Sequence, residues 1–272
     1  MNTLAFIGGG NMASAIIGGL VASGRPGASI VVVEPFEAQR VKLEADFGVR
    51  AFAAADTALA EASLVVWAVK PQLFTAAAAS CAASCATQLA RALHLSVMAG
   101  IRTDAIARAT GSARVVRAMP NTPALIGQGI AGLFARSGVS ADERAQVEAV
   151  LAPTGQLLWV EREQDLDAVT ALSGSGPAYV FYFIEAMVQA ALDMGLTEAQ
   201  GKRLALATFG GATSLAQASA DPPALLRERV TSKGGTTHAA ISALDRSGVK
   251  AALIAAIRAA EQRARELGDE FG

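Results

Sequence analysis

The hydrophobic pattern divides the chain into two parts. In the first part, short runs that are almost wholly apolar alternate with helical stretches. The predicted strands are residues 4–7, 30–33, 64–69, 93–98, 115–119, 130–134 and 157–160. Because runs of this kind are apolar on both faces, they are typical of a parallel sheet that helices cover on both sides. The pattern predicts an N-terminal α/β domain with a doubly wound, Rossmann-type parallel sheet.

The second part shows no strand signal after residue 162 and consists of helical patterns. Two helix starts can be recognised. Thr197, with Gln200 three residues later, resembles a capping box, and Asp221 precedes Pro222 as an N-cap precedes a proline at the first helical position. We therefore expect an α/β domain over residues 1–162 and an all-helical domain over residues 163–272.

Composition and charge narrow the classes of function. The 272 residues suffice for two domains with real cores, and 23 Lys and Arg against 24 Asp and Glu leave a net charge of −1. Such a balance gives no field that attracts nucleic acid or an anionic membrane, so neither is an expected partner. Hydrophobic residues make up 52% and charged residues only 17%, which predicts that another subunit covers part of the surface.

No targeting or membrane segment is expected. Leu4–Ser23 is apolar, but no basic residue precedes it and five glycines interrupt it. Pro177–Leu192 contains Glu185 and is shorter than a bilayer requires. Cys81 and Cys85 are expected to be free thiols in a reducing cytosol rather than a disulfide or half a metal site. The sequence thus predicts a cytoplasmic protein without a bound metal.

The first predicted strand runs directly into a glycine-rich turn. Residues 8–13 have the form G-x-G-x-x-A and precede an apolar helical run. Glycines allow a tight turn and close backbone approach, and the helix N-terminus directs free N–H groups at a pyrophosphate. We predict a dinucleotide site that involves Gly8, Gly10, Asn11 and Met12; a merely structural glycine turn is the alternative.

Glu34 closes the second predicted strand, about where an acidic side chain accepts hydrogen bonds from the adenosine ribose of a dinucleotide. A carboxylate there would repel a 2′-phosphate. Two alternatives remain: Glu34 could be an ordinary solvated residue at a strand end, and Arg40 on the next helix could lie near a 2′-phosphate. The choice between NADH and NADPH is therefore open.

Three further loops follow the carboxyl ends of predicted strands, where ligands of doubly wound sheets bind. These loops provide six predicted cofactor contacts: Val69, Lys70, Pro71, Ala99, Gly100 and Asn121. Lys70 stands directly before a proline and is placed to reach the cofactor, although an ordinary surface lysine would look the same.

A second polar segment lies near the C-terminal end, at residues 229–238. It combines small hydroxyl side chains with Gly234 and Gly235, just ahead of a helical run. Backbone N–H groups of such a loop, together with the helix dipole, favour an anion such as a carboxylate. A polar loop that only caps the helix is the alternative.

Five motifs, taken in order and spacing, resemble the pyrroline-5-carboxylate reductase family over nearly the whole chain. They are residues Ile7–Met12, Ala68–Pro71, Arg117–Pro123, Ser173–Tyr179 and Val230–Thr237. The last two are specific to that family, whereas the first occurs in many dinucleotide enzymes. Lys233 departs from the pattern, because many members have proline there.

The resemblance implies reduction of L-1-pyrroline-5-carboxylate to L-proline with NADPH or NADH as the cofactor. Ser232 and Thr237 would be the catalytic residues. Substrate contacts would come from Ser232, Gly234, Gly235, Thr236, Thr237 and Thr122. In this interpretation the loop holds the substrate carboxylate and the Thr237 hydroxyl faces the ring nitrogen. His238 is the weaker candidate for the proton donor, since it already enters the helix.

The resemblance also implies a homodimer with intertwined helical domains, which could assemble into a decamer of five dimers. The amphipathic segment Tyr179–Leu192 suits such an interface, although it could equally be a core helix. Two rival functions can be weighed. A β-hydroxyacid dehydrogenase would need a lysine that Pro177–Met194 lacks, and a cofactor-sensing protein without turnover would not need the loop at 232–237.

Overall fold

The computed structural model describes residues 3–55 and 59–271, and the chain divides into two compact units. Met1–Ser175 together with Ala260–Gly272 form the first unit, and Gly176–Ala259 form the second. The expected fold class, an α/β sheet followed by a helical region, is confirmed. The domain boundary expected after residue 162 stays a prediction. Residues just beyond it pack on the sheet, because a Cβ at Gly132 would lie 2.7 Å from Val169.

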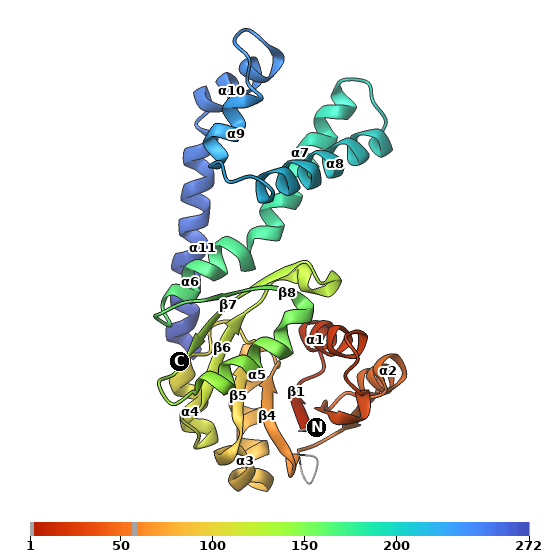
Figure 1. Cartoon of the computed structure of the whole chain (residues 1–272), viewed down its shortest axis with the longest axis vertical. Helices are drawn as coiled ribbons and strands as arrows, with labels where there is room; N and C mark the ends of the chain where they lie inside the picture. Colours follow the sequence, from red (N-terminus) through yellow and green to blue (C-terminus); the bar gives the residue numbers. More distant parts are fainter. Residues whose placement is uncertain (1–2, 56–58, 272) are drawn as a thin grey trace. The chain divides into compact units, whose positions relative to one another are not determined.

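In the described part of the chain, the first unit contains an eight-stranded sheet in the order β3-β2-β1-β4-β5-β6-β7-β8 (Figure 1). The strands are β1 (Thr3–Ile7), β2 (Ile30–Val33), β3 (Arg50–Phe52), β4 (Ala62–Trp67), β5 (Leu93–Ser96), β6 (Val115–Met119), β7 (Gly129–Ala135) and β8 (Gly155–Trp159). All seven predicted strands are present, with shifts at their ends. Strand β3 was not predicted, because it is too short to show a pattern and carries an exposed residue, Arg50.

Strand β7 runs antiparallel to β6, so the expectation of an all-parallel sheet is wrong at this position. Between the two strands the chain forms only the short η4 (Thr122–Ile126), and such a connection lacks the crossover helix that parallel neighbours need. Helix α5 (Ala141–Leu151) supplies a crossover before β8, which is parallel to β7. The pairs from β3 to β6 are parallel, so their carboxyl ends share one edge of the sheet.

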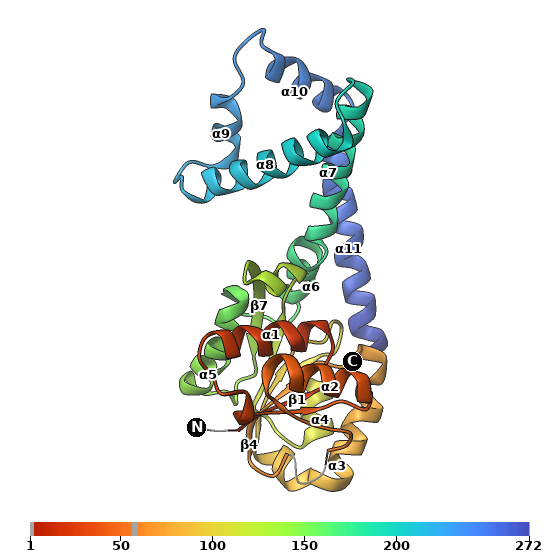
Figure 2. The same cartoon turned by 90° about the vertical axis from the view of Figure 1, so that its right-hand side faces the viewer.

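Helices cover both faces of the sheet (Figure 2). On one face lie α1 (Asn11–Ala22), α2 (Glu37–Phe47) and α5, whose buried residues Ile16, Leu43 and Val147 join one apolar cluster. On the other lie α3 (Phe74–Arg91) and α4 (Thr103–Thr110), which bury Phe74 and Ile106 in a second cluster. The segment Pro71–Arg91 is long and apolar enough to cross a membrane by length and composition alone. Here its apolar side packs into the core.

Buried polar groups of this core are satisfied locally. Trp67 Nε1 donates to His94 Nδ1 at 3.0 Å, and His94 Nε2 lies 2.8 Å from the Leu89 carbonyl oxygen. These two contacts suit a neutral imidazole with its proton on Nε2. Burial is the main reason that the pKa of His94 falls to about 4. As predicted, Cys81 and Cys85 are not joined by a disulfide; both are buried, and burial raises the pKa of Cys81 to about 11.

The second unit consists of helices. They are α7 (Gly176–Asp193), α8 (Glu198–Gln217), α9 (Pro223–Arg229), α10 (Thr236–Arg246) and the first part of α11 (Val249–Phe271), which belongs to the first unit from Ala260 onward. The predicted capping box of Thr197 and Gln200 is confirmed. The start predicted for α9 is wrong by one residue, because the helix begins at Pro223. A proline disfavours helical geometry in the residue before it, so Pro222 stays extended.

Helices α7 and α8 pack closely but bury little. A Cβ at Gly201 would lie only 2.8 Å from the Ala191 side chain, so Gly201 permits the close approach. Among the described residues of the second unit, only Ala191, Gly201 and Ala205 are buried. Large apolar side chains remain exposed, including Phe181 at 64% and Tyr182 at 70%. Since a folded unit needs an apolar core, we expect another subunit to cover these exposed apolar side chains.

Candidate active site

The glycine-rich turn between β1 and α1 is shaped for a bound anion. Gly8 has a φ of +96°, and a Cβ there would lie 2.7 Å from the Ala68 carbonyl oxygen, so only glycine fits. Gly10 precedes α1, and a Cβ there would meet nothing within 4 Å. The first hydrogen bond of α1 runs from the Ser14 N–H to the Gly10 carbonyl oxygen. The N–H groups before Ser14 therefore point out of the helix end into open space.

The middle glycine of the turn is held from two sides. The Gly9 N–H donates to Glu34 Oε2 at 2.9 Å, and Gln39 Nε2 donates to the Gly9 carbonyl oxygen at 2.5 Å. A Cβ at Gly9 would lie 2.6 Å from Leu43 of α2. These contacts thus fix the conformation of the turn. Gln39 was not predicted, since no sequence motif marks a side chain that holds a neighbouring backbone segment.

Glu34 lies at the end of β2 and is 7% exposed, so it is not a solvated residue. Its second oxygen, Oε1, accepts a hydrogen bond from the Phe36 N–H at 3.0 Å. Two backbone amides therefore fix the carboxylate. Arg40 lies behind this segment, where its Nη1 donates to the carbonyl oxygens of Glu34 at 2.9 Å and Pro35 at 2.7 Å.

A cleft of about 840 Å³ opens beside this turn. It brings together five of the predicted cofactor residues: Gly8, Gly10, Glu34, Val69 and Lys70. Phe36 and Leu73, which also line the cleft, are 72% and 53% exposed. Exposed apolar side chains at the mouth of a cleft with a fixed carboxylate suit an adenosine, which has one apolar ring system and one polar sugar. The chain's own residues therefore fit a dinucleotide.

The remaining predicted cofactor residues do not line this cleft. They are Asn11 and Met12 in the first turn of α1, together with Pro71, Ala99, Gly100 and Asn121 at strand ends. Gly100 has a φ of +76°, and a Cβ there would lie 3.3 Å from Leu267 of α11. Asn121 Oδ1 accepts a hydrogen bond from the Ile130 N–H at 3.0 Å, so it holds the connection between β6 and β7. Thr122 is exposed at the start of η4, and its contact with substrate stays a prediction.

Two motifs meet at the end of β6. Residues Thr170–Gly174 form a π-helix, in which the Ser175 N–H donates to the Thr170 carbonyl oxygen at 2.8 Å. A Cβ at Gly174 would lie 2.7 Å from Met119 Cε. The serine-glycine motif therefore packs against the segment 117–123. π-Helical turns occur often at functional sites.

A buried ionic cluster that was not predicted supports the same strand. Arg117 of β6 is 3% exposed and pairs with Glu163 at 3.3 Å. Glu163 also accepts from the Thr103 N–H and hydroxyl, both at 2.7 Å. Burial raises the pKa of the nearby Asp167, and the positive charge of Arg117 opposes that rise. These residues come from four separate segments, so no local pattern reveals the cluster.

In the second unit, the loop before α10 forms a closed turn. The Gly235 N–H donates to the Ser232 carbonyl oxygen at 3.0 Å, and Gly234 between them has a φ of +78°. Positive φ at the third position is typical of a type II turn, whose second position favours proline. Lys233 occupies that second position. A type II turn thus accounts for the proline that many family members have at position 233. Lysine fits the same turn and leaves the backbone N–H donors that follow it unchanged.

The N-terminus of α10 offers backbone donors next to hydroxyl groups. Gly235 is the N-cap and provides no side-chain oxygen to satisfy the first N–H groups of the helix. Thr236 and Thr237 are the first residues of α10, and Thr237 is half-buried. A Cβ at Gly235 would lie 2.8 Å from Ser232 Oγ, so glycine keeps that hydroxyl in place. The loop brings Ser232, Gly234, Gly235, Thr236 and Thr237 together, while His238 is exposed.

Comparisons with known proteins identify the family of the chain. The family described as pyrroline-5-carboxylate reductase dimerisation matches residues 163–267, and the family described as NADP oxidoreductase, coenzyme F420-dependent, matches residues 3–100. The pyrroline-5-carboxylate reductase of Pseudomonas aeruginosa is 43% identical over 270 residues, covering 99% of this chain and 98% of that protein.

Solved structures are similar over the same length. A pyrroline-5-carboxylate reductase from Coxiella burnetii superposes with a TM-score of 0.90 at 35% identity and covers 98% of each chain. The Plasmodium falciparum pyrroline carboxylate reductase with NADP bound gives a TM-score of 0.86 at 25% identity, again over 98% of each chain. This similarity spans both the glycine-rich turn and the loop before α10, and the chain belongs to the pyrroline-5-carboxylate reductase family.

Proposed function

We propose that this enzyme reduces L-1-pyrroline-5-carboxylate to L-proline with NAD(P)H, the last step of proline biosynthesis. One observation carries the proposal: the same chain has a glycine-rich turn with open N–H groups at the start of α1 and a closed turn, Ser232–Gly235, at the N-terminus of α10. The first turn suits a dinucleotide, and the second suits a small carboxylate. The reaction of the family uses both ligands, a dinucleotide and a small carboxylate.

The cofactor is held by the first unit. Reduced nicotinamide supplies a hydride from its C4. The N–H groups of Asn11 and Met12 and the dipole of α1 bind the pyrophosphate, and Gly10 leaves room for it. Glu34 binds the adenosine ribose. We assign the strand-end residues Val69, Lys70, Pro71, Ala99, Gly100 and Asn121 to the rest of the dinucleotide.

The substrate carboxylate binds at the turn before α10. The open N–H groups of Gly235, Thr236 and Thr237 and the Ser232 hydroxyl donate hydrogen bonds to it, and Gly234 gives the turn its shape. Hydrogen bonds to a charged acceptor are worth about 1.5–3 kcal/mol each, so a few of them hold a small anion firmly. The positive end of the α10 dipole adds to this attraction.

The chemistry at the ring needs little from the protein. Protonation of the imine nitrogen makes the neighbouring ring carbon ready to accept a hydride. The enzyme therefore needs only to orient the ring and to provide that one proton at the nitrogen. Thr237 is our candidate for the residue that hydrogen-bonds the ring nitrogen, because its hydroxyl lies in the first turn of α10, next to the carboxylate-binding turn. A hydroxyacid dehydrogenase would need a lysine acid, and α7 contains none in its described sequence Gly176–Asp193.

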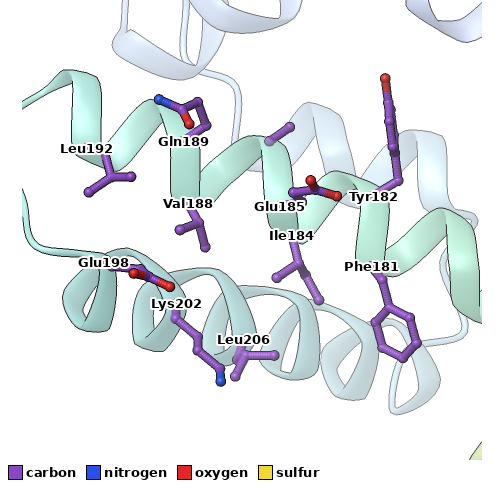
Figure 3. A pocket seen from close by; sticks show the side chains of 11 residues that line it. Phe181, Tyr182, Ile184, Glu185, Val188, Gln189, Leu192, Glu198, Lys202 and Leu206 are labelled. Atoms are coloured by element: carbon purple, nitrogen blue, oxygen red, sulfur yellow. The ribbon is translucent and has the colours of Figure 1, made fainter.

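We also propose that two copies intertwine through their helical regions. A groove of about 770 Å³ runs between α7 and α8 (Figure 3). Phe181, Ile184 and Val188 point into it from α7, and Leu206 faces them from α8. Together with the exposed Tyr182, this surface is too apolar to remain in water. Helices of a second subunit are its expected cover, and five such dimers would form the decamer.

Two cysteines that form no disulfide, together with the family's reaction, suit a cytoplasmic enzyme. The proposed activity is tested by mixing the purified protein with pyrroline-5-carboxylate and either reduced cofactor. We expect substrate-dependent loss of the nicotinamide absorbance and formation of proline. Folded protein that binds the cofactor but forms no proline would contradict the proposal.

A further inference from the structure

The carboxylate of Glu34 is fixed in the cofactor cleft. It is 7% exposed, and each of its oxygens accepts a backbone N–H, from Gly9 at 2.9 Å and from Phe36 at 3.0 Å. Moving the side chain away would leave both amides without their acceptor. The negative charge therefore stays at the end of β2 whatever ligand enters the cleft.

We propose that Glu34 makes this enzyme select NADH over NADPH. An acidic residue at the end of the second strand of such a sheet lies at the ribose 2′-hydroxyl of the dinucleotide. Each carboxylate oxygen keeps a free lone pair, with which it can accept a hydrogen bond from that hydroxyl. A 2′-phosphate at the same place would bring a dianion against a buried anion. The inference rests on the proposed use of NAD(P)H and states which of the two cofactors, NADH or NADPH, the enzyme prefers.

The cations around the cleft do not offset this charge. The Nη1 of Arg40 is already bound to the carbonyl oxygens of Glu34 and Pro35, and Arg40 does not line the cleft. Lys42 and Lys70 line it, but both are exposed; the Lys42 side chain is 64% exposed and pairs with Asp46 at 3.0 Å. Exposed lysines are flexible and screened by salt, whereas Glu34 is buried and rigid. The fixed charge therefore outweighs the mobile ones.

Adenosine fragments test the inference without turnover. Titration calorimetry at physiological salt compares 5′-AMP with 2′,5′-ADP, which differ only in the 2′-phosphate. We expect the full-length protein to bind 5′-AMP about tenfold or more tightly than 2′,5′-ADP, in the range expected for one unfavourable charge contact. NADH and NADPH themselves should show the same order of affinity.

Two variants separate the charge from the support of the turn. Glu34→Gln removes the charge at nearly constant size, and we expect the affinity ratio to shift towards 2′,5′-ADP by about tenfold. Gln39→Leu removes the hydrogen bond to the Gly9 carbonyl oxygen without changing any charge. It should weaken both ligands alike and leave their ratio unchanged.

The outcomes are distinct. Tighter binding of 2′,5′-ADP to the wild-type protein overturns the inference and assigns specificity to Arg40, Lys42 or Lys70. An unchanged ratio in Glu34→Gln also overturns it, and if that variant does not fold, the wild-type ratio alone decides. Failure of the wild type to bind either fragment, or NADH, overturns the cofactor site itself and the proposed function with it.

Discussion

Replacing two glycines of the same turn by alanine should separate cofactor binding from folding. At Gly10 the backbone has a φ of −69°, which every residue adopts, and a Cβ meets nothing within 4 Å. Alanine gains about 0.4–1 kcal/mol by restricting the unfolded chain and loses a similar amount as a poorer N-cap than glycine. The free energy of unfolding of Gly10→Ala should therefore stay within about 0.5 kcal/mol of wild type.

Cofactor affinity should respond quite differently. The new methyl group fills the space in front of the α1 N-terminus, where the pyrophosphate approaches the backbone. Losing one hydrogen bond to a charged phosphate costs about 1.5–3 kcal/mol, so NADH should bind roughly ten- to a hundredfold more weakly.

Gly8→Ala is the matched control with the opposite expectation. Its φ of +96° and the 2.7 Å approach to the Ala68 carbonyl oxygen make alanine strained at this position. The left-handed backbone alone costs about 1–2 kcal/mol, and the contact with Ala68 adds to it. Urea unfolding followed by circular dichroism should show a lower midpoint for Gly8→Ala and an unchanged one for Gly10→Ala. Calorimetric binding of NADH to Gly10→Ala with wild-type affinity would refute the placement of the pyrophosphate.

Three further predictions concern the substrate site, the core and the helical region. Thr237→Ala should lower kcat and kcat/KM together by roughly ten- to a hundredfold, while Thr237→Ser keeps both. Ser232→Ala should mainly raise KM for the imine, because the carboxylate charge does not change during hydride transfer. Steady-state kinetics that showed only a KM effect for Thr237→Ala would make its hydroxyl a binding contact. Since burial lowers the pKa of His94 from 6.5 to about 4, the unfolded chain binds the proton more readily, and the free energy of unfolding should fall as pH drops from 6.5 towards 4, by roughly 2 kcal/mol at pH 5. His94→Gln should remove that part of the pH dependence in urea titrations, and an identical profile would contradict the assignment. Phe181→Glu places a charge on the exposed apolar face of α7 and should shift sedimentation towards the monomer, while a variant that keeps the wild-type assembly would exclude this face from the interface.

Local signals predicted much of the first unit. Seven strands follow from apolar runs, and the glycine-rich turn follows from its spacing after β1, because both depend only on neighbouring residues. The capping box at Thr197 is local in the same way. The antiparallel direction of β7 could also have been inferred, since fewer residues separate it from β6 than a crossover helix requires.

Other features depend on residues far apart in the chain. Glu34 was predicted as a ribose ligand, but its hydrogen bond to the Gly9 N–H joins residues from two strand ends whose distance only the folded sheet sets. The same holds for Gln39 and for the ion pair of Arg117 with Glu163. A charged residue inside an apolar strand, as Arg117 is in β6, was the one available signal for that cluster.

In the proposed reaction this chain transfers a hydride from a reduced nicotinamide to pyrroline-5-carboxylate. The most direct measurement uses NADH carrying deuterium at both C4 positions and analyses the proline product by mass spectrometry. We expect L-proline with one deuterium, located on C5, at a rate that depends on enzyme concentration. Unlabelled proline, or no proline from folded protein that binds NADH, would contradict it.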